Sequence, residues 1–200
     1  MDMQYYQHLL LIGAVMAVVG CLFIYFWPRM LLSVFKRAIL VKGFGDGPIP
    51  VNTLYTESQA LFAEPLAAQT ASSSNLMTVG VNHDTLATAG WLDLSRGALV
   101  LHVPDMNDRY YSVQFTDPST NTNFAYVGKR TTGTQAGDYL ITGPGWMGQV
   151  PSGMQQISSP NRSVLLLGRV LVESDSDLST AYGLSKQIQL TPLSHWQPGQ

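Results

Sequence analysis

The stretch YYSVQFTDPSTNTNFAYVG, from Tyr110 to Gly128, decides the fold class of this chain. Apolar and polar side chains alternate in its first part, which places Tyr111, Val113 and Phe115 on one face. A period of two residues is typical of a β-strand with one buried face. DPSTNT then supplies turn residues, and NFAYVG is a second extended run. The stretch therefore predicts two successive strands.

Similar short runs lie on both sides of this stretch. They are ALVLHV at 98–103, DYLITG at 138–143 and SVLLLGRVLV at 163–172, each bounded by Gly, Pro, Asn or Asp. Several short strands at this spacing favour an antiparallel β-sandwich or barrel-like domain over an α/β fold. We place this mainly β domain at 51–200. We expect two short helices beside it, one from Asn52 to about Pro65 and one at 178–188.

The glycine-rich segment GKRTTGTQAGDYLITGPGW, at 128–146, raises the question of a phosphate-binding loop. That loop requires the pattern GxxxxGK[ST] between a strand and a helix. Asn123 stands where the first glycine belongs, Arg130 replaces the Ser or Thr, and no helical pattern follows. The glycines are better explained as tight turns between strands.

The N-terminal segment predicts a membrane anchor. Leu9 to Trp27 reads LLLIGAVMAVVGCLFIYFW without a charged residue, which is about the length that a helix needs to cross the hydrocarbon core. Tyr25 and Trp27 at one end, with Tyr5 and Tyr6 at the other, fit the aromatic belts of the two interfaces. We therefore predict a single transmembrane helix within 1–27, in contact with membrane lipid.

The next segment, 28–50, combines an amphipathic part and a linker. PRMLLSVFKRAILVKGF is an amphipathic juxtamembrane segment that could form a second, interfacial helix beginning at Pro28. GFGDGPIP, from Gly43 to Pro50, cannot continue a helix. Four basic residues follow the span and none precedes it, so charge counting alone places the β domain in the cytoplasm.

Composition excludes several classes of function. Charged residues make up 12% of the chain and the net charge is -2, which gives no reason to expect a nucleic-acid partner. The one cysteine, Cys21, lies in the apolar segment, so the sequence predicts neither a disulfide framework nor a thiol metal site. We predict no cofactor and no metal ion.

No complete catalytic set can be assembled from the sequence, so no catalytic residue is assigned. Ser95, His83 and His102 with nearby aspartates could form a triad or a metal site, but their spacing does not require it. Arg130 and Arg169 fit either structural ion pairs with Asp93, Asp117 or Asp138, or recognition of an anion. The best candidate pocket gathers polar and aromatic residues: Asn82, Asp84, Trp91, Asp93, Arg130 and Trp146.

Six short motifs in order resemble a known bacterial family. They are Asn-x-Asp-Thr-Leu at 82–86, Trp-Leu-Asp-Leu at 91–94, Val-Pro-Asp at 103–105, Arg-Tyr-Tyr at 109–111, Arg-Thr-Thr-Gly-Thr at 130–134 and Gly-Pro-Gly-Trp at 143–146. The chain resembles the family filed as domain of unknown function 1254, from about Val51 to Leu193. The first motif departs from the family, since Ala87 and Thr88 stand where Tyr-Ser is usual.

The resemblance implies a β-rich domain without an assigned activity. It also implies a companion β-domain, filed as 1214, which we expect to be a separate small membrane-anchored protein. Two functions stay open: a non-enzymatic, membrane-tethered subunit of an envelope complex, and a ligand-binding or hydrolase-like domain. The resemblance and the Thr- and Ser-rich composition favour a bacterial inner-membrane protein with a periplasmic domain, against the charge count.

Overall fold

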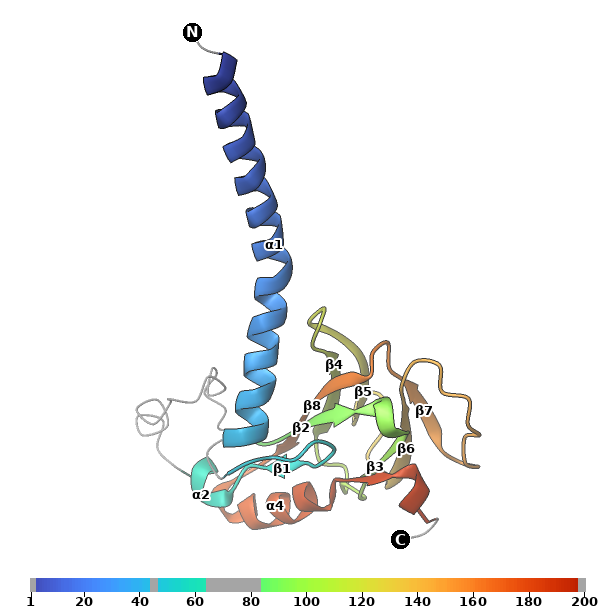
Figure 1. Ribbon diagram of the computed structural model, residues 1–200. Helices are drawn as coiled ribbons and strands as arrows, with labels where there is room; N and C mark the ends of the chain where they lie inside the picture. Colours follow the sequence, from blue (N-terminus) through green and yellow to red (C-terminus); the bar gives the residue numbers. More distant parts are fainter. Residues whose placement is uncertain (1–2, 44–46, 64–83, 198–200) are drawn as a thin grey trace. The chain divides into compact units, whose positions relative to one another are not determined.

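The computed structural model describes residues 3–43, 47–63 and 84–197 (Figure 1). The chain divides into two compact units, Met1–Ala38 and Ile39–Gln200. The first unit is helical and the second contains both sheets.

Helix α1 is one continuous helix, Met3–Lys42, of 40 residues. A second helix beginning at Pro28 was one interpretation of the sequence, but α1 continues through this proline (Figure 1). Pro28 cannot donate a hydrogen bond to the carbonyl four residues earlier. The Arg29 guanidinium donates a hydrogen bond to the Tyr25 carbonyl at 2.6 Å, and it lies 3.7 Å from the centre of the Tyr25 ring. These contacts stabilise the helical turn next to Pro28. The apolar part of α1 is long enough to cross a membrane.

The second unit is a two-sheet β-sandwich, which confirms the predicted fold class. The five-stranded sheet has the order β1 (Tyr55–Thr56), β2 (Thr85–Asp93), β8 (Ser163–Leu171), β4 (Tyr111–Asp117) and β5 (Thr122–Gly128). The four-stranded sheet has the order β7 (Gln155–Ser158), β6 (Gly137–Thr142), β3 (Leu99–Val103) and β9 (Gln189–Pro192).

The core lies between the two sheets. Tyr111, Val113 and Phe115 of β4 are fully buried, as their alternation predicts, and they belong to the same apolar cluster as Leu101 of β3 and other residues of the second sheet. A smaller cluster covers the outer face of the four-stranded sheet, where Trp146 packs beside Val100 and Leu140.

Two differences from the expected architecture have local causes. Strands β6 and β7 pair in parallel, because residues 143–154 return the chain to the same end of the sheet before β7 begins. Asn52 does not cap the short helix that was expected to run from Asn52 to about Pro65. Its backbone is left-handed (φ 64°), and its side-chain amide makes two hydrogen bonds with the backbone of Asp93, so the chain enters β1 instead.

Short helices complete the unit: α2 (Gln59–Phe62), α4 (Leu178–Gln187) and the 3-10 turns η1 (Leu94–Arg96), η2 (Asp175–Asp177) and η3 (Leu193–His195). Helix α4 fits the helix expected at 178–188. It buries Ala181 in the main core, and the Ser185 hydroxyl is 3.0 Å from that of Thr88 on β2.

Candidate functional site

The six residues of the predicted pocket lie in several parts of the fold. Asn82 lies outside the described residues. Asp84 is exposed just before β2, where its carbonyl accepts the Val172 amide. Trp91, on β2, is only 1% exposed, and its indole N–H donates to the Ser163 hydroxyl at 2.7 Å. Burial of this degree makes Trp91 a packing residue of the sandwich.

Asp93 lies two residues after Trp91 and points to the same face of β2. Its carboxylate accepts the Ser95 amide at 2.9 Å and caps η1. Arg130 is exposed after β5, with its guanidinium 5.5 Å from the centre of the Tyr110 ring. Trp146 follows β6 and packs on the outer face of the other sheet. The structure thus brings Trp91 and Asp93 together, and it places Arg130 and Trp146 in loops that follow strands of different sheets.

An open cavity of about 510 Å³ lies beside η1. Of the predicted pocket residues that the structure describes, Asp93 alone lines it. Arg96 adds a guanidinium, while Leu99, Pro192 and Leu193 supply an apolar wall. Its size is in the range of small-molecule sites, although such sites are usually more enclosed.

His102 and Asp138 form a half-exposed pair on the outer face of the four-stranded sheet. They stand opposite each other on β3 and β6, and the His102 Nδ1 atom is 2.8 Å from the Asp138 carboxylate. The other carboxylate oxygen accepts the Trp196 indole N–H at 3.2 Å. A histidine oriented by a carboxylate can act as a general base when a nucleophile lies next to it. The carboxylate also joins the C-terminal segment to the sheet.

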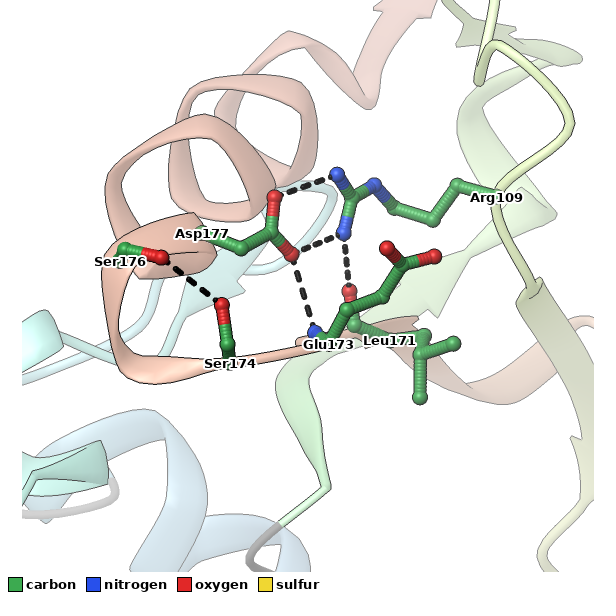
Figure 2. A network of polar contacts seen from close by, with 6 residues as sticks. All are labelled: Arg109, Leu171, Glu173, Ser174, Ser176 and Asp177. Carbon is green, nitrogen blue, oxygen red and sulfur yellow. Dashed lines mark hydrogen bonds and ion pairs between the residues drawn. The ribbon is translucent and has the colours of Figure 1, made fainter.

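The strongest polar network of the second unit was missed by the sequence reasoning (Figure 2). The Arg109 guanidinium makes two parallel contacts with the Asp177 carboxylate, at 2.5 and 2.7 Å. It also donates to the Leu171 carbonyl at 2.8 Å, and Asp177 accepts the Glu173 amide at 3.0 Å. The Arg109 hydrogen bonds lower the pKa of the Asp177 carboxyl. The only available signals were the Arg-Tyr-Tyr motif and the acidic run before α4.

Arg109 connects the start of β4 to the end of β8 and the start of α4, which lie 62 and 68 residues further along the chain. Arg109 precedes β4, Leu171 ends β8 and Asp177 begins the turn into α4. Both side chains are largely removed from solvent, at 11% and 18% exposure, and the Asp177 carboxylate contacts the Arg109 guanidinium and the Glu173 amide (Figure 2). The network therefore holds helix α4 against the sheet.

Two further carboxylates also accept hydrogen bonds from backbone or side-chain donors. Asp117 is buried, which alone would raise its pKa, but donors from Ser119, Thr120 and Asn161 lower it. Burial raises the pKa of the Glu57 carboxyl, which accepts the Ala87 amide at 3.0 Å. Both groups hold loops or edges of the sandwich in place.

The glycine-rich segment forms turns, as expected. A Cβ atom on Gly128 would lie 2.6 Å from the Tyr111 carbonyl oxygen, so only glycine fits there. The amides of Thr131 and Thr132 both donate to the Gly128 carbonyl at 2.9 Å, so the chain makes a tight turn after β5. Gly133 and Gly145 adopt left-handed φ angles of 84° and 75°. The segment holds no phosphate-binding arrangement, since no helix follows it.

Among residues 3–43, 47–63 and 84–197, no three His, Cys, Asp or Glu side chains gather in a way that could hold a metal ion. Fold and site together define a class: a β-sandwich domain that follows a long apolar helix and whose polar clusters serve mainly to join its elements.

Comparison with known proteins gives the family. The profile of the family described as "Protein of unknown function (DUF1254)" matches residues 64–192. The chain belongs to this family, which confirms the resemblance seen in its motifs. No match was found among curated proteins.

Two solved structures are similar. The VPA0106 protein from Vibrio parahaemolyticus is 23% identical with a TM-score of 0.62, over 85% of this chain and 37% of that chain. An uncharacterized protein from Burkholderia cenocepacia is 15% identical with a TM-score of 0.42, over 73% of this chain and 36% of that one. The first likeness supports the sandwich fold, and this chain spans little more than a third of that protein.

Proposed function

We propose that the protein is a membrane-tethered, non-enzymatic subunit of a bacterial envelope complex, and that its sandwich binds a second, separately anchored protein. The observation that carries the proposal is a pair of exposed apolar side chains in one loop. Met147 is 94% exposed and Val150 is 39% exposed, both in the segment between β6 and β7. Exposed large apolar side chains that are close in sequence mark contact surfaces more often than catalytic sites.

The position of this loop supports a contact with another protein. Trp146, next to Met147, packs on the cluster of Val100 and Leu140, so the exposed side chains project from a fixed base. Interfaces are enriched in Trp and Met, and a rigid base reduces the entropy lost on binding.

Photo-crosslinking in the native host tests the proposal. A photoreactive amino acid at position 147 of the full chain should give one discrete crosslinked product that contains a second membrane-anchored protein. The matched control is position 126, since Tyr126 is also an exposed large side chain but lies on β5 of the other sheet. Equal products at both positions, or none at 147, would contradict the proposal.

A second function, ligand binding, is favoured by the cavity beside η1. Its lining combines Asp93, Arg96 and an apolar wall, which could orient a small polar ligand. A screen of small metabolites by thermal shift, repeated with Arg96→Ala, tests this alternative. A ligand that stabilises the wild-type domain but not the variant would favour binding over subunit contact.

A further inference from the structure

Arg130 and Arg169 do not form the structural ion pairs that the sequence allowed. The three aspartates considered as their partners accept hydrogen bonds from other residues: Asp93, Asp117 and Asp138. Within residues 3–43, 47–63 and 84–197, neither guanidinium has a hydrogen bond or an ion pair, and both arginines are exposed. Of the two interpretations of these arginines, the structure leaves recognition of an anion.

Both arginines lie at the outer face of the five-stranded sheet. Arg169 precedes the fully buried Val170 on β8, so its own side chain points away from the core. Tyr110 precedes the fully buried Tyr111 and points outward for the same reason. The Arg130 guanidinium lies 5.5 Å from the centre of the Tyr110 ring, which places it at this face as well.

Strand pairing brings the two arginines to one place in the second compact unit. Arg169 of β8 is opposite Ser112 of β4, and Ser112 is opposite Gly128 of β5, two residues before Arg130. Tyr110 is a diagonal neighbour of Arg169, and such neighbours are within reach of long and aromatic side chains. Because β4 lies between β8 and β5, Tyr110 and Ser112 lie between the two arginines.

The residues around Arg169 are small. A Cβ atom on Gly128 would lie 3.4 Å from the Ser112 Cβ, so both positions face the same side and Gly128 leaves space there. On β2 the residue opposite Arg169 is Ala87. Small neighbours on both sides leave room for a ligand at the guanidinium, and the half-buried Ser112 hydroxyl can donate a further hydrogen bond to it.

Two charged groups beside this region have contacts of their own. The Lys129 ammonium is 2.8 Å from the Asp108 carboxylate. The Glu57 carboxylate accepts the Ala87 amide at 3.0 Å and makes no ion pair with Arg169. Asp108 therefore offsets the charge of Lys129, while Arg169 keeps a guanidinium without a carboxylate in contact.

We propose that Arg130 and Arg169 together bind a phosphate group, with the Ser112 hydroxyl as a further donor. Planar guanidinium groups bind phosphate oxygens through pairs of parallel hydrogen bonds. A phosphate monoester has a charge of about −1.5 to −2 and three strong acceptor oxygens. It therefore matches two cations and a hydroxyl better than a carboxylate with one charge and two oxygens. This site is independent of the subunit contact proposed for the loop between β6 and β7.

Isothermal titration calorimetry of the full chain in a neutral detergent tests the site, with inorganic phosphate as the probe at constant ionic strength. We expect Arg130→Gln and Arg169→Gln each to weaken phosphate binding at least tenfold. Arg162→Gln is the matched control, since Arg162 is also exposed but lies before the other end of β8. This variant should bind phosphate like the wild type.

Nanodiscs distinguish a lipid headgroup from a soluble phosphate as the natural source. If a lipid occupies the site, discs with phosphatidic acid should bind inorganic phosphate more weakly than discs of phosphatidylcholine alone. Phosphatidylserine is the control, because it adds negative charge without a phosphate monoester. Equal affinity in all three lipids would identify a soluble phosphate compound, and either result supports the site.

Three results would overturn the proposal. They are wild-type binding no stronger than that of the double variant Arg130→Gln with Arg169→Gln, weakening by only one of the two single variants, or equal weakening by Arg162→Gln. Thermal unfolding of each variant shows whether the sandwich is intact, so a loss of binding can be separated from a loss of folding.

Discussion

Asp177 shows how a charged residue of a turn can become a structural residue. In the sequence it resembles one more helix-capping aspartate before α4, yet its side chain makes no cap bond. Both carboxylate oxygens of Asp177 instead accept hydrogen bonds from the Arg109 guanidinium. Removing one partner of a largely buried pair leaves the other charge unpaired, which costs more than the pair itself contributes.

Substitution of Asp177 by Asn should therefore destabilise the domain in a pH-dependent way. Because Arg109 lowers the folded-state pKa of Asp177, this stability is present above the ordinary carboxyl pKa of about 3.9 and is lost as pH falls through the lower folded value. We expect a loss of about 2–4 kcal/mol in the free energy of unfolding near pH 7. The difference from wild type should shrink below about pH 4. Urea unfolding between pH 3 and 7 measures it.

The double variant Arg109→Met with Asp177→Asn serves as the control. It removes both charges, so it should be more stable than Asp177→Asn alone. A single variant whose deficit stays constant down to pH 3 would show that the ion pair is not the cause.

At the scale of elements, much of the sandwich could be read from local periodicity. Strands β3, β4, β5, β6 and β8 coincide with the predicted extended runs, and α4 with the predicted terminal helix. Strand β2 was not predicted, because its run TLATAGWLD is buried on both faces and has little alternation.

Long-range pairing explains what periodicity could not show. The pairing of β2 with β8 and the Arg109–Asp177 network join segments far apart in the chain, and the direction of β7 depends on the path of residues 143–154. The candidate pocket residues were chosen by residue type, and their positions on the two sheets depend on the same pairings.

Two glycines of the sandwich should respond in opposite ways to substitution by alanine. A methyl group on Gly128 of β5 would meet the Tyr111 carbonyl at 2.6 Å, whereas Gly183 of α4 faces open space. We expect Gly128→Ala to lower the free energy of unfolding by about 1–3 kcal/mol, as overpacking does. Gly183→Ala should raise it by about 0.5–1 kcal/mol, because alanine favours the helix. Two variants that shift in the same direction in urea unfolding would contradict this account.

At the scale of the whole molecule, the sandwich should fold without the membrane segment, and its stability should depend on the residue at which the chain is truncated. The second compact unit begins at Ile39, and both Ile39 and Ile49 are buried. We expect 39–200 to be soluble and monomeric, since its core lies between its own sheets. A shorter form, 51–200, loses both isoleucines and should melt several degrees lower. Thermal unfolding of the two forms side by side measures the difference, and equal melting temperatures would contradict it.

Two features of the sequence favour opposite sides of the membrane for the sandwich. Arg29, Lys36, Arg37 and Lys42 follow the apolar segment and no basic residue precedes it, which by charge counting favours the cytoplasm. The composition of the domain, rich in Thr, Ser, Asn and Gly, favours the periplasm. The basic residues are interleaved with Leu, Phe and Ile, so they can bind anionic headgroups of either leaflet. We propose a periplasmic domain.

A reporter that works only in the cytoplasm should be inactive when fused after Gln200, and one that works only in the periplasm should be active. The same fusions to 39–200 provide the control, because without α1 both should report the cytoplasm. The reverse pattern in the full chain would refute the periplasmic placement and show that the four basic residues determine the orientation.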